Sequence, residues 1–182
     1  MPDGSHIISG GADKNVRLYQ TTDLRKSKSD TLSWLPRLKP AEEIWANFVD
    51  SVSTTVYCLA YSPRGDLLVM GGAHGRILVR DVADEKYVTL PSISAHDGGV
   101  NTLAFSPDGT LLVSGSADRT LKIWDVSSGR PDGEPLAVLT GHSADVNSVA
   151  FSPDSRYIAS AASDQTVRLW GLRKPFEEKP KR

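Results

Sequence analysis

Residues 100–126 read VNTLAFSPDGTLLVSGSADRTLKIWDV, and residues 146–172 read VNSVAFSPDSRYIASAASDQTVRLWGL. Eleven of the 27 positions are identical, and Trp124 and Trp170 hold the same place in the two stretches. Self-similarity at a fixed period is the sequence signature of a repeat architecture. One unit that recurs along the chain therefore decides the fold.

Each copy contains three short runs of β-branched and other apolar residues. In the first copy these runs are VNTLAF, LLVSGS and LKIWDV, and the turns between them are SPDG and ADRT. Runs of this length and composition, bounded by turn residues, are typical of strands. Further runs over residues 87–92 and 135–139 predict a fourth strand in the connection before each copy. Each unit is therefore expected to form a four-stranded antiparallel sheet.

Two less regular copies come first. Residues 56–82 align with the later units and have Arg80 in the tryptophan place. Residues 2–20 align with the later part of the unit, retain Ser9 and Asp13, and have Tyr19 in the tryptophan place. The repeat therefore extends over nearly the whole chain.

These units resemble the repeats of the WD-repeat β-propeller family. The resemblance is carried by Gly141-His142, by its variant Ala95-His96, and by Trp124-Asp125. A serine and an aspartate also stand between each histidine and tryptophan of the last two units. The resemblance covers most of residues 2–172, and it implies that each unit is one blade of a propeller.

The resemblance also implies a hydrogen-bonded tetrad of histidine, serine, aspartate and tryptophan inside a blade. A buried carboxylate needs donors, and the N–H of an imidazole ring supplies one. The other imidazole nitrogen can meet the serine hydroxyl, whose oxygen can accept from the indole N–H. Two complete tetrads are expected: His96, Ser114, Asp118 and Trp124, and then His142, Ser160, Asp164 and Trp170.

Serine, histidine and aspartate together also suggest a hydrolase. A hydrolase needs one serine at an open surface, with an oxyanion hole beside it. Here two sets occupy the same places in two repeats, and each serine falls inside a predicted strand. The tetrads are therefore expected to be structural, and no catalytic residues are expected.

The second unit carries other residues at the four tetrad places, namely Val52, Met70, His74 and Arg80. No tetrad can form there, so this blade is expected to depend on apolar packing alone. We expect it to be the least stable complete blade, held by Leu59, Leu67, Val69, Ile77 and Val79.

The expected fold class is all-β: a partial β-propeller of about 3.5 blades, with two complete four-stranded blades and two incomplete terminal blades. Residues 1–172 are expected to form the WD-repeat propeller segment, and residues 173–182 a charged tail without fixed structure. Three explanations of the incomplete blades stay open. The chain is part of a longer protein, or it associates with another propeller fragment or with itself through open blade edges, or it forms a small closed or open arc.

Residues 21–43 form an insertion loop, because the interval from Tyr19 to Arg80 is longer than the two that follow it. The insertion is expected between the third and fourth strands of the first blade. It contains a candidate docking motif of Trp34, Leu35 and Arg37, since insertions in repeat proteins often map to a binding face. The alternative is that Trp34 folds back over the edge of the blade.

In a meander of four strands, the second–third turns and the loops that lead to the next blade emerge on one face. In the family this face commonly receives peptides and partner proteins. Mixed charges on it favour polar peptides, and the alternative is an ordinary solvated set of loops. The candidate partner-binding residues are Lys14, His74, Asp97, Arg119, Asp145 and Gln165.

The composition excludes several classes of function. With 21 basic and 22 acidic residues, the chain has a formal net charge of −1, so bulk attraction to nucleic acid is not expected. The lone cysteine, Cys58, cannot form an internal disulfide bond, and the four histidines lack metal-ligand spacing, so no metal and no cofactor are expected. No signal peptide and no bilayer-spanning run is recognised, so the expected location is cytoplasmic or nuclear.

We therefore expect a non-enzymatic scaffold that binds other proteins or peptides, alone or within a larger propeller or multidomain signalling protein. A first alternative is a substrate-receptor subunit of a ubiquitin ligase. Residues 170–173, Trp-Gly-Leu-Arg, partly resemble the Trp-Asp-x-Arg box of such propellers, with Gly171 in the acidic place. A second alternative, a propeller enzyme, would need unpaired carboxylates or a metal set at the channel mouth, and the sequence shows neither.

Overall fold

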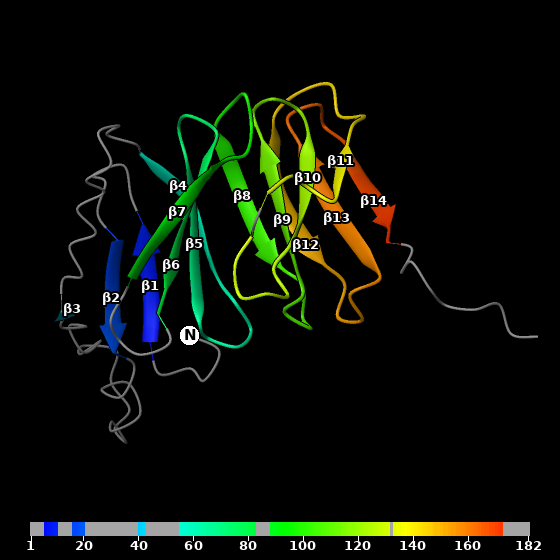
Figure 1. Ribbon diagram of the computed structural model, residues 1–182. Coiled ribbons are helices and arrows are strands. Elements are labelled where there is room, and N and C mark those ends of the chain that lie inside the picture. The colour runs from blue at the N-terminus through cyan, green and yellow to red at the C-terminus, as the bar shows by residue number, and fades with distance from the viewer. Residues whose placement is uncertain are drawn as a thin grey trace, which may run out of the picture.

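The computed structural model of the chain describes residues 6–10, 16–20, 40–42, 55–82, 88–131 and 133–172. These residues form fourteen strands and no helix. The strands make four sheets of three, four, four and three strands in chain order (Figure 1). The expected all-β partial propeller, with two complete blades between two incomplete ones, is confirmed.

The first sheet contains β1 (His6–Gly10), β2 (Val16–Gln20) and β3 (Pro40–Glu42), in that order. Because β3 lies within residues 21–43, the expectation that this whole stretch is a loop was wrong at its end. β3 is an edge strand, and edge strands are where sheets tolerate proline, because one side of such a strand forms no ladder hydrogen bonds. Its three residues are also too few to show an alternating pattern in the sequence.

The second sheet contains β4 (Val56–Tyr61), β5 (Leu67–Gly72), β6 (Arg76–Asp81) and β7 (Val88–Ser94). The third contains β8 (Val100–Phe105), β9 (Leu111–Ser116), β10 (Leu121–Asp125) and β11 (Ala137–Leu139). The last contains β12 (Val146–Phe151), β13 (Tyr157–Ala162) and β14 (Val167–Gly171). Relative to the expected fourth strands over residues 87–92 and 135–139, β7 extends further and β11 is shorter.

Tight turns that begin with Ser-Pro, at residues 62–65, 106–109 and 152–155, join the first and second strands of the last three units. In the third sheet the carboxylate of Asp108 accepts hydrogen bonds from Ser106 Oγ at 2.6 Å and from Thr110 N at 3.1 Å. Gly109 follows with a φ of 69°, a left-handed conformation that glycine adopts without strain. In the last sheet Ser155 holds this place with a φ of 58°.

The sheets pack face to face in chain order (Figure 1): β1 lies against β4, β4 and β5 against β8, and β8 and β9 against β12. We call the side of a sheet that faces the next sheet its forward face, and the opposite side its rear face. Val69, Ile77 and Val79 on the forward face of the second sheet pack in one core with the rear face of the third, which supplies Val100, Leu112 and Trp124.

A second core continues this pattern. On the forward face of the third sheet, Val113, Leu121 and Ile123 pack with Val146 and Ile158 of the last sheet. The cores therefore lie between sheets, and the turns and loops lie at the two ends of the strands.

The described residues contain no helix that is long and apolar enough to cross a bilayer.

Candidate functional site

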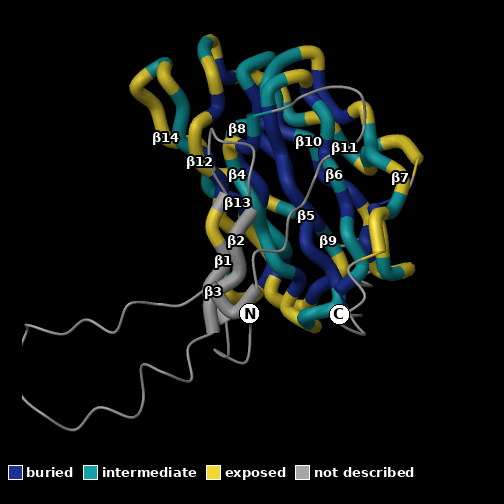
Figure 2. Tube along the Cα trace, turned by 90° about the vertical axis from the view of Figure 1, so that its left-hand side faces the viewer, coloured by how far each residue is buried: buried dark blue, intermediate teal, exposed yellow. Residues whose placement is uncertain are grey.

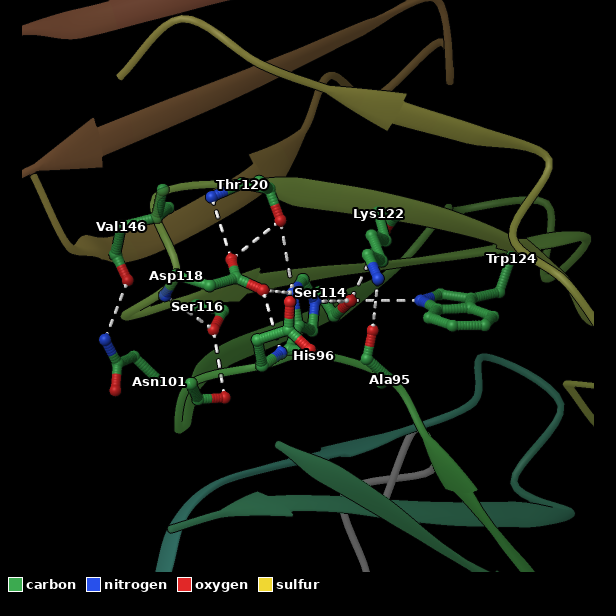
Figure 3. Close-up of polar contacts among 12 residues, drawn as sticks. Ala95, His96, Asn101, Ser114, Ser116, Asp118, Thr120, Lys122, Trp124 and Val146 are labelled. Atoms are coloured by element: carbon green, nitrogen blue, oxygen red, sulfur yellow. Dashed lines mark hydrogen bonds and ion pairs between the residues drawn. The ribbon is translucent and has the colours of Figure 1, made fainter. Parts of the chain in front are cut away.

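One histidine, in the loop before β8, joins β9, β10 and the turn between them into a single hydrogen-bonded network (Figure 3). His96 Nδ1 lies 2.8 Å from Asp118 Oδ2, and His96 Nε2 lies 2.7 Å from Ser114 Oγ. Trp124 Nε1 donates to the same Ser114 oxygen at 3.0 Å. An ionised carboxylate only accepts, so Nδ1 carries the proton, and Nε2 accepts from the serine hydroxyl. These are the contacts that the tetrad requires.

Thr120 is a fifth member of this network that was not predicted from the sequence. Its hydroxyl donates to Asp118 Oδ1 at 2.7 Å, and its backbone N–H donates to the same oxygen at 3.0 Å. The backbone N–H of Asp97 adds a further donor to Asp118 Oδ2 at 3.2 Å. The signal that could have found Thr120 is the Asp-x-Thr pattern of both regular repeats.

The last sheet repeats this network. His142 Nδ1 lies 2.8 Å from Asp164 Oδ2, its Nε2 lies 2.8 Å from Ser160 Oγ, and Trp170 Nε1 donates to that oxygen at 2.9 Å. Thr166 donates to Asp164 Oδ1 through its hydroxyl at 2.7 Å. Two copies at equivalent positions indicate a device that belongs to the repeat unit rather than to one special site.

Burial and hydrogen bonding set the ionisation of these groups. Burial is the largest influence on the pKa of His96 and lowers it, although the nearby Asp118 carboxylate opposes this in part. Burial alone would raise the pKa of Asp118, but hydrogen bonds from Thr120 and His96 outweigh it and hold that pKa below its usual range. The pKa of Asp164 is also lowered, first by the Thr166 hydroxyl. Neutral imidazole therefore faces ionised carboxylate in the third sheet at neutral pH.

The serine, histidine and aspartate contacts have the order of a hydrolase triad, but the serines lack access. Ser114 is 0% exposed and Ser160 is 2% exposed. Each hydroxyl oxygen also accepts a hydrogen bond from a tryptophan indole N–H, at 3.0 Å in the third sheet and 2.9 Å in the last. The geometry therefore favours a structural role for both sets.

The second sheet contains no such network at its described positions. Met70 takes the serine place and is buried, and it packs with Val56, Leu68 and Val82. Cys58 donates through its thiol to Val100 O at 3.4 Å, and burial raises its pKa to about 12, so the thiol stays protonated. Apolar contacts on both faces of this sheet take the place of the tetrad.

The second–third turns and the inter-sheet loops lie at the same end of the strands, as expected. Backbone hydrogen bonds join them: Ala117 N donates to Gly99 O at 2.9 Å, and Ser163 N donates to Asp145 O at 2.8 Å. We call residues 73–76, 95–99, 117–120, 141–145 and 163–166 the loop face. The candidate partner-binding residues that the structure describes are all exposed on it: His74, Asp97, Arg119, Asp145 and Gln165.

Arg119 and Gln165 hold equivalent places on the loop face and share an unusual backbone conformation. Their φ values are 71° and 64°, and Gly75 holds the same place in the second sheet with a φ of 69°. Left-handed conformations are costly for side chains larger than glycine. The left-handed backbone at these two residues is not predictable from the sequence.

Tyr57 is an exposed aromatic residue that the sequence analysis did not single out. It is 54% exposed, and its ring lies against Gly99, where Tyr57 Cε2 would be 3.0 Å from an added Cβ. Asn101 and Asn147 hold the equivalent places in the next two units. The signal that could have found Tyr57 is that an aromatic residue stands where the other two units have asparagine, at the second residue of the first strand.

Four candidate residues lie outside the described part of the chain: Lys14 of the partner-binding face, and Trp34, Leu35 and Arg37 of the docking motif. Arg173 of the box-like stretch also lies outside it. Within the described residues, no group of three or more histidine, cysteine, aspartate or glutamate side chains could hold a metal ion. A hollow of about 330 Å³ between β7 and the residues Arg130, Pro131 and Gly133 is lined by none of the candidate residues.

The chain matches the family model described as WD domain, G-beta repeat, over residues 1–20, 47–81, 87–125 and 133–171. Each of the last two matches begins with the outer strand of one sheet and ends with the third strand of the next. A comparison with curated proteins gives no match. Because the four matches cover most of the chain, the chain belongs to the family of WD-repeat proteins.

Proposed function

We propose that the chain is a non-enzymatic scaffold that binds a polar peptide segment of a partner protein on its loop face. WD repeats are protein-interaction domains of a generally non-enzymatic kind. The observation that carries the proposal is the way in which Arg119 and Gln165 are presented. Each is an exposed side chain on backbone that the buried network holds in place.

Arg119 lies between Asp118 and Thr120 in the sequence. The side chains of these two neighbours form hydrogen bonds with each other and with His96. The backbone N–H of Arg119 also donates to Ser116 O at 3.1 Å. A side chain on a fixed backbone loses less conformational entropy when it binds. The strained φ of 71° persists because its neighbours are held on both sides.

The chemistry of the loop face suits a peptide that carries both charges. Asp97 and Asp145 are exposed carboxylates in the two inter-sheet loops, and Arg119 is an exposed cation between them in sequence. Beside the loop face, Tyr57 of β4 adds an exposed aromatic ring that lies against Gly99, and aromatic residues often anchor an interface. Charge complementarity of this kind selects partners and fixes the register of binding.

Selection of peptides from a random library on the full chain, followed by affinity measurement on variants, tests this proposal. Arg119→Gly removes the side chain and suits the left-handed backbone, as Gly75 does at the equivalent place. Binding of the selected peptides is expected to weaken about tenfold, which corresponds to about 1.4 kcal/mol.

Ser155→Gly is the matched control, since Ser155 is also left-handed, with a φ of 58°, but lies in a turn at the opposite end of the strands. It should leave the affinity unchanged. Selected peptides that bind Arg119→Gly and Gln165→Gly as tightly as the unaltered chain would contradict the proposal.

A further inference from the structure

The forward face of the last sheet is exposed, although the same face is buried in the two preceding sheets. Val167 is 75% exposed and Leu169 is 70% exposed. Their equivalents in the third sheet, Leu121 and Ile123, are buried against the last sheet, and Ile77 and Val79 are buried in the second. Figure 2 shows the contrast between the exposed stretches of β12 and β14 and the buried strand β5.

At the opposite end of the row of sheets, the rear face of the first sheet is exposed at Ser9, the one residue of that sheet whose exposure the structure describes. Ser9 in β1 pairs with Arg17, as Ser114 pairs with Lys122 and Ser160 with Arg168. Ser114 and Ser160 are buried on the rear faces of their sheets, whereas Ser9 is exposed. The described residues therefore include an exposed forward face on the last sheet and an exposed rear position, Ser9, on the first.

The internal interfaces show how a forward face receives the next sheet. A Cβ on Gly71 would lie 2.6 Å from Val100 Cγ1, and a Cβ on Gly115 would lie 2.7 Å from Val146 Cγ1. Glycine is needed at these two places because the valine that begins the next inner strand approaches the backbone closely. In the last sheet Ala161 holds this place. A valine placed as Val100 or Val146 is would therefore collide with the methyl group of Ala161.

The first sheet is the one described sheet that brings no such valine on an inner strand. Its order is β1-β2-β3, and β1 holds the place that β9 and β13 hold in the later sheets. Within the described residues, no strand of this sheet corresponds to β8 or β12. We propose that the forward face of the last sheet in one copy of the chain binds the rear face of the first sheet in a second copy.

This contact is heterologous, because it joins two different surfaces of the same chain. Such contacts form a ring when the rotation closes and a filament when it does not. Each copy supplies four sheets, and closed propellers contain four to eight. Two copies of this chain would supply eight described sheets, a number that one closed propeller can contain. The proposed contact uses neither Arg119 nor Gln165, so it stands or falls independently of peptide binding on the loop face.

Sedimentation velocity of the full chain over a hundredfold range of concentration tests the assembly. A species with twice the mass of one chain is expected to dominate at the upper end. Val167→Arg and Leu169→Arg should each weaken the association at least tenfold. Leu136→Arg is the matched control, since Leu136 is 61% exposed but precedes β11 at the outer side of the third sheet. A single-chain mass at every concentration would overturn the proposal.

Cross-linking distinguishes this pairing from other ways of covering the same face. Ser9→Cys chains and Leu169→Cys chains are mixed and treated with a short bis-maleimide, while the protonated Cys58 thiol reacts poorly. Cross-links between the two different variants should exceed those within either variant alone by at least fivefold. Dominant links between two Leu169→Cys chains would indicate pairing of like faces and would also overturn the proposal.

Discussion

In the third sheet the indole nitrogen of Trp124 donates to the hydroxyl oxygen of Ser114 over 3.0 Å, and both side chains are buried. The contact joins β10 to β9 through side chains in addition to the backbone ladder. The same hydroxyl meets His96, so one oxygen connects two strands to the loop before β8. A fully satisfied buried network of this kind specifies how a blade packs.

Trp124→Phe is expected to destabilise the chain by about 1–3 kcal/mol, because it leaves a buried hydroxyl without its indole donor. Trp170→Phe should cost less, since Trp170 is only partly buried on the last sheet. Urea unfolding monitored by circular dichroism measures both. An equal or greater loss at Trp170 would show that the indole contact is not what stabilises these blades.

Gly115→Ala is expected to cost about 1–3 kcal/mol, because its methyl group would overlap Val146 and Thr102 side chains at the sheet interface. Gly171→Ala is the matched control in another strand, since the nearest atom to its added Cβ is 3.9 Å away. Thermal unfolding of the two variants gives the comparison. If both variants melt alike, the close approach of the sheets is not a constraint.

Stability is expected to fall in two stages as the solution is acidified. The pKa of His96 is lowered in the folded state, so the unfolded chain binds more protons below its ordinary pKa of about 6.5. The stability that comes from neutral His96 is therefore fully present above pH 6.5, and it is lost as the pH falls through the pKa of His96 in the folded state. The pKa of Asp118 is also lowered, so its contribution is complete above about pH 3.9 and is lost as pH falls through the folded value.

Thermal midpoints measured between pH 8 and pH 3 check this order of events. His96→Gln should be less stable at pH 8 and should lose much of the slope between pH 7 and pH 5. An unchanged slope in that variant would assign the first stage to other groups.

The second sheet is expected to exchange its backbone amides faster than the third, because Met70 replaces the serine and no tetrad bonds its strands together. Hydrogen exchange followed by mass spectrometry would compare β4–β6 with β8–β10. Greater protection of the second sheet would mean that its apolar packing on both faces outweighs the missing polar contacts.

Neither Ser114 nor Ser160 is expected to react with a fluorophosphonate probe, because both are almost fully buried. Intact mass measurement after incubation would detect the adduct. Labelling that is lost in Ser114→Ala or Ser160→Ala would identify a reactive serine and contradict the non-enzymatic proposal.

The network of His96, Ser114, Asp118 and Trp124 was accessible from the sequence because two copies carry the same residues at the same spacing. The strands of the regular repeats were accessible for the same reason, since turn residues bound each apolar run. Repetition reveals what the units share, and the packing of the sheets follows from it.

What differs between units was harder to predict. The short edge strand β3 has no alternating pattern, and the exposure of Tyr57 depends on the loop that lies beside it. The left-handed backbone at Arg119 and Gln165 is invisible in the sequence, because glycine holds the equivalent place only once, at Gly75. The exposure of Val167 and Leu169 depends on whether another sheet packs against β14, and the two residues themselves do not determine this.

Each of the last two WD repeats takes its first strand from one sheet and its other three from the next. A gene rearrangement that copies or removes one such unit would therefore exchange an outer strand between neighbours and leave every blade with its normal number of strands. For protein engineering, this offset makes residues 87–125 the natural cassette to duplicate or delete, whereas a cut at the limits of a sheet would divide two repeats at once.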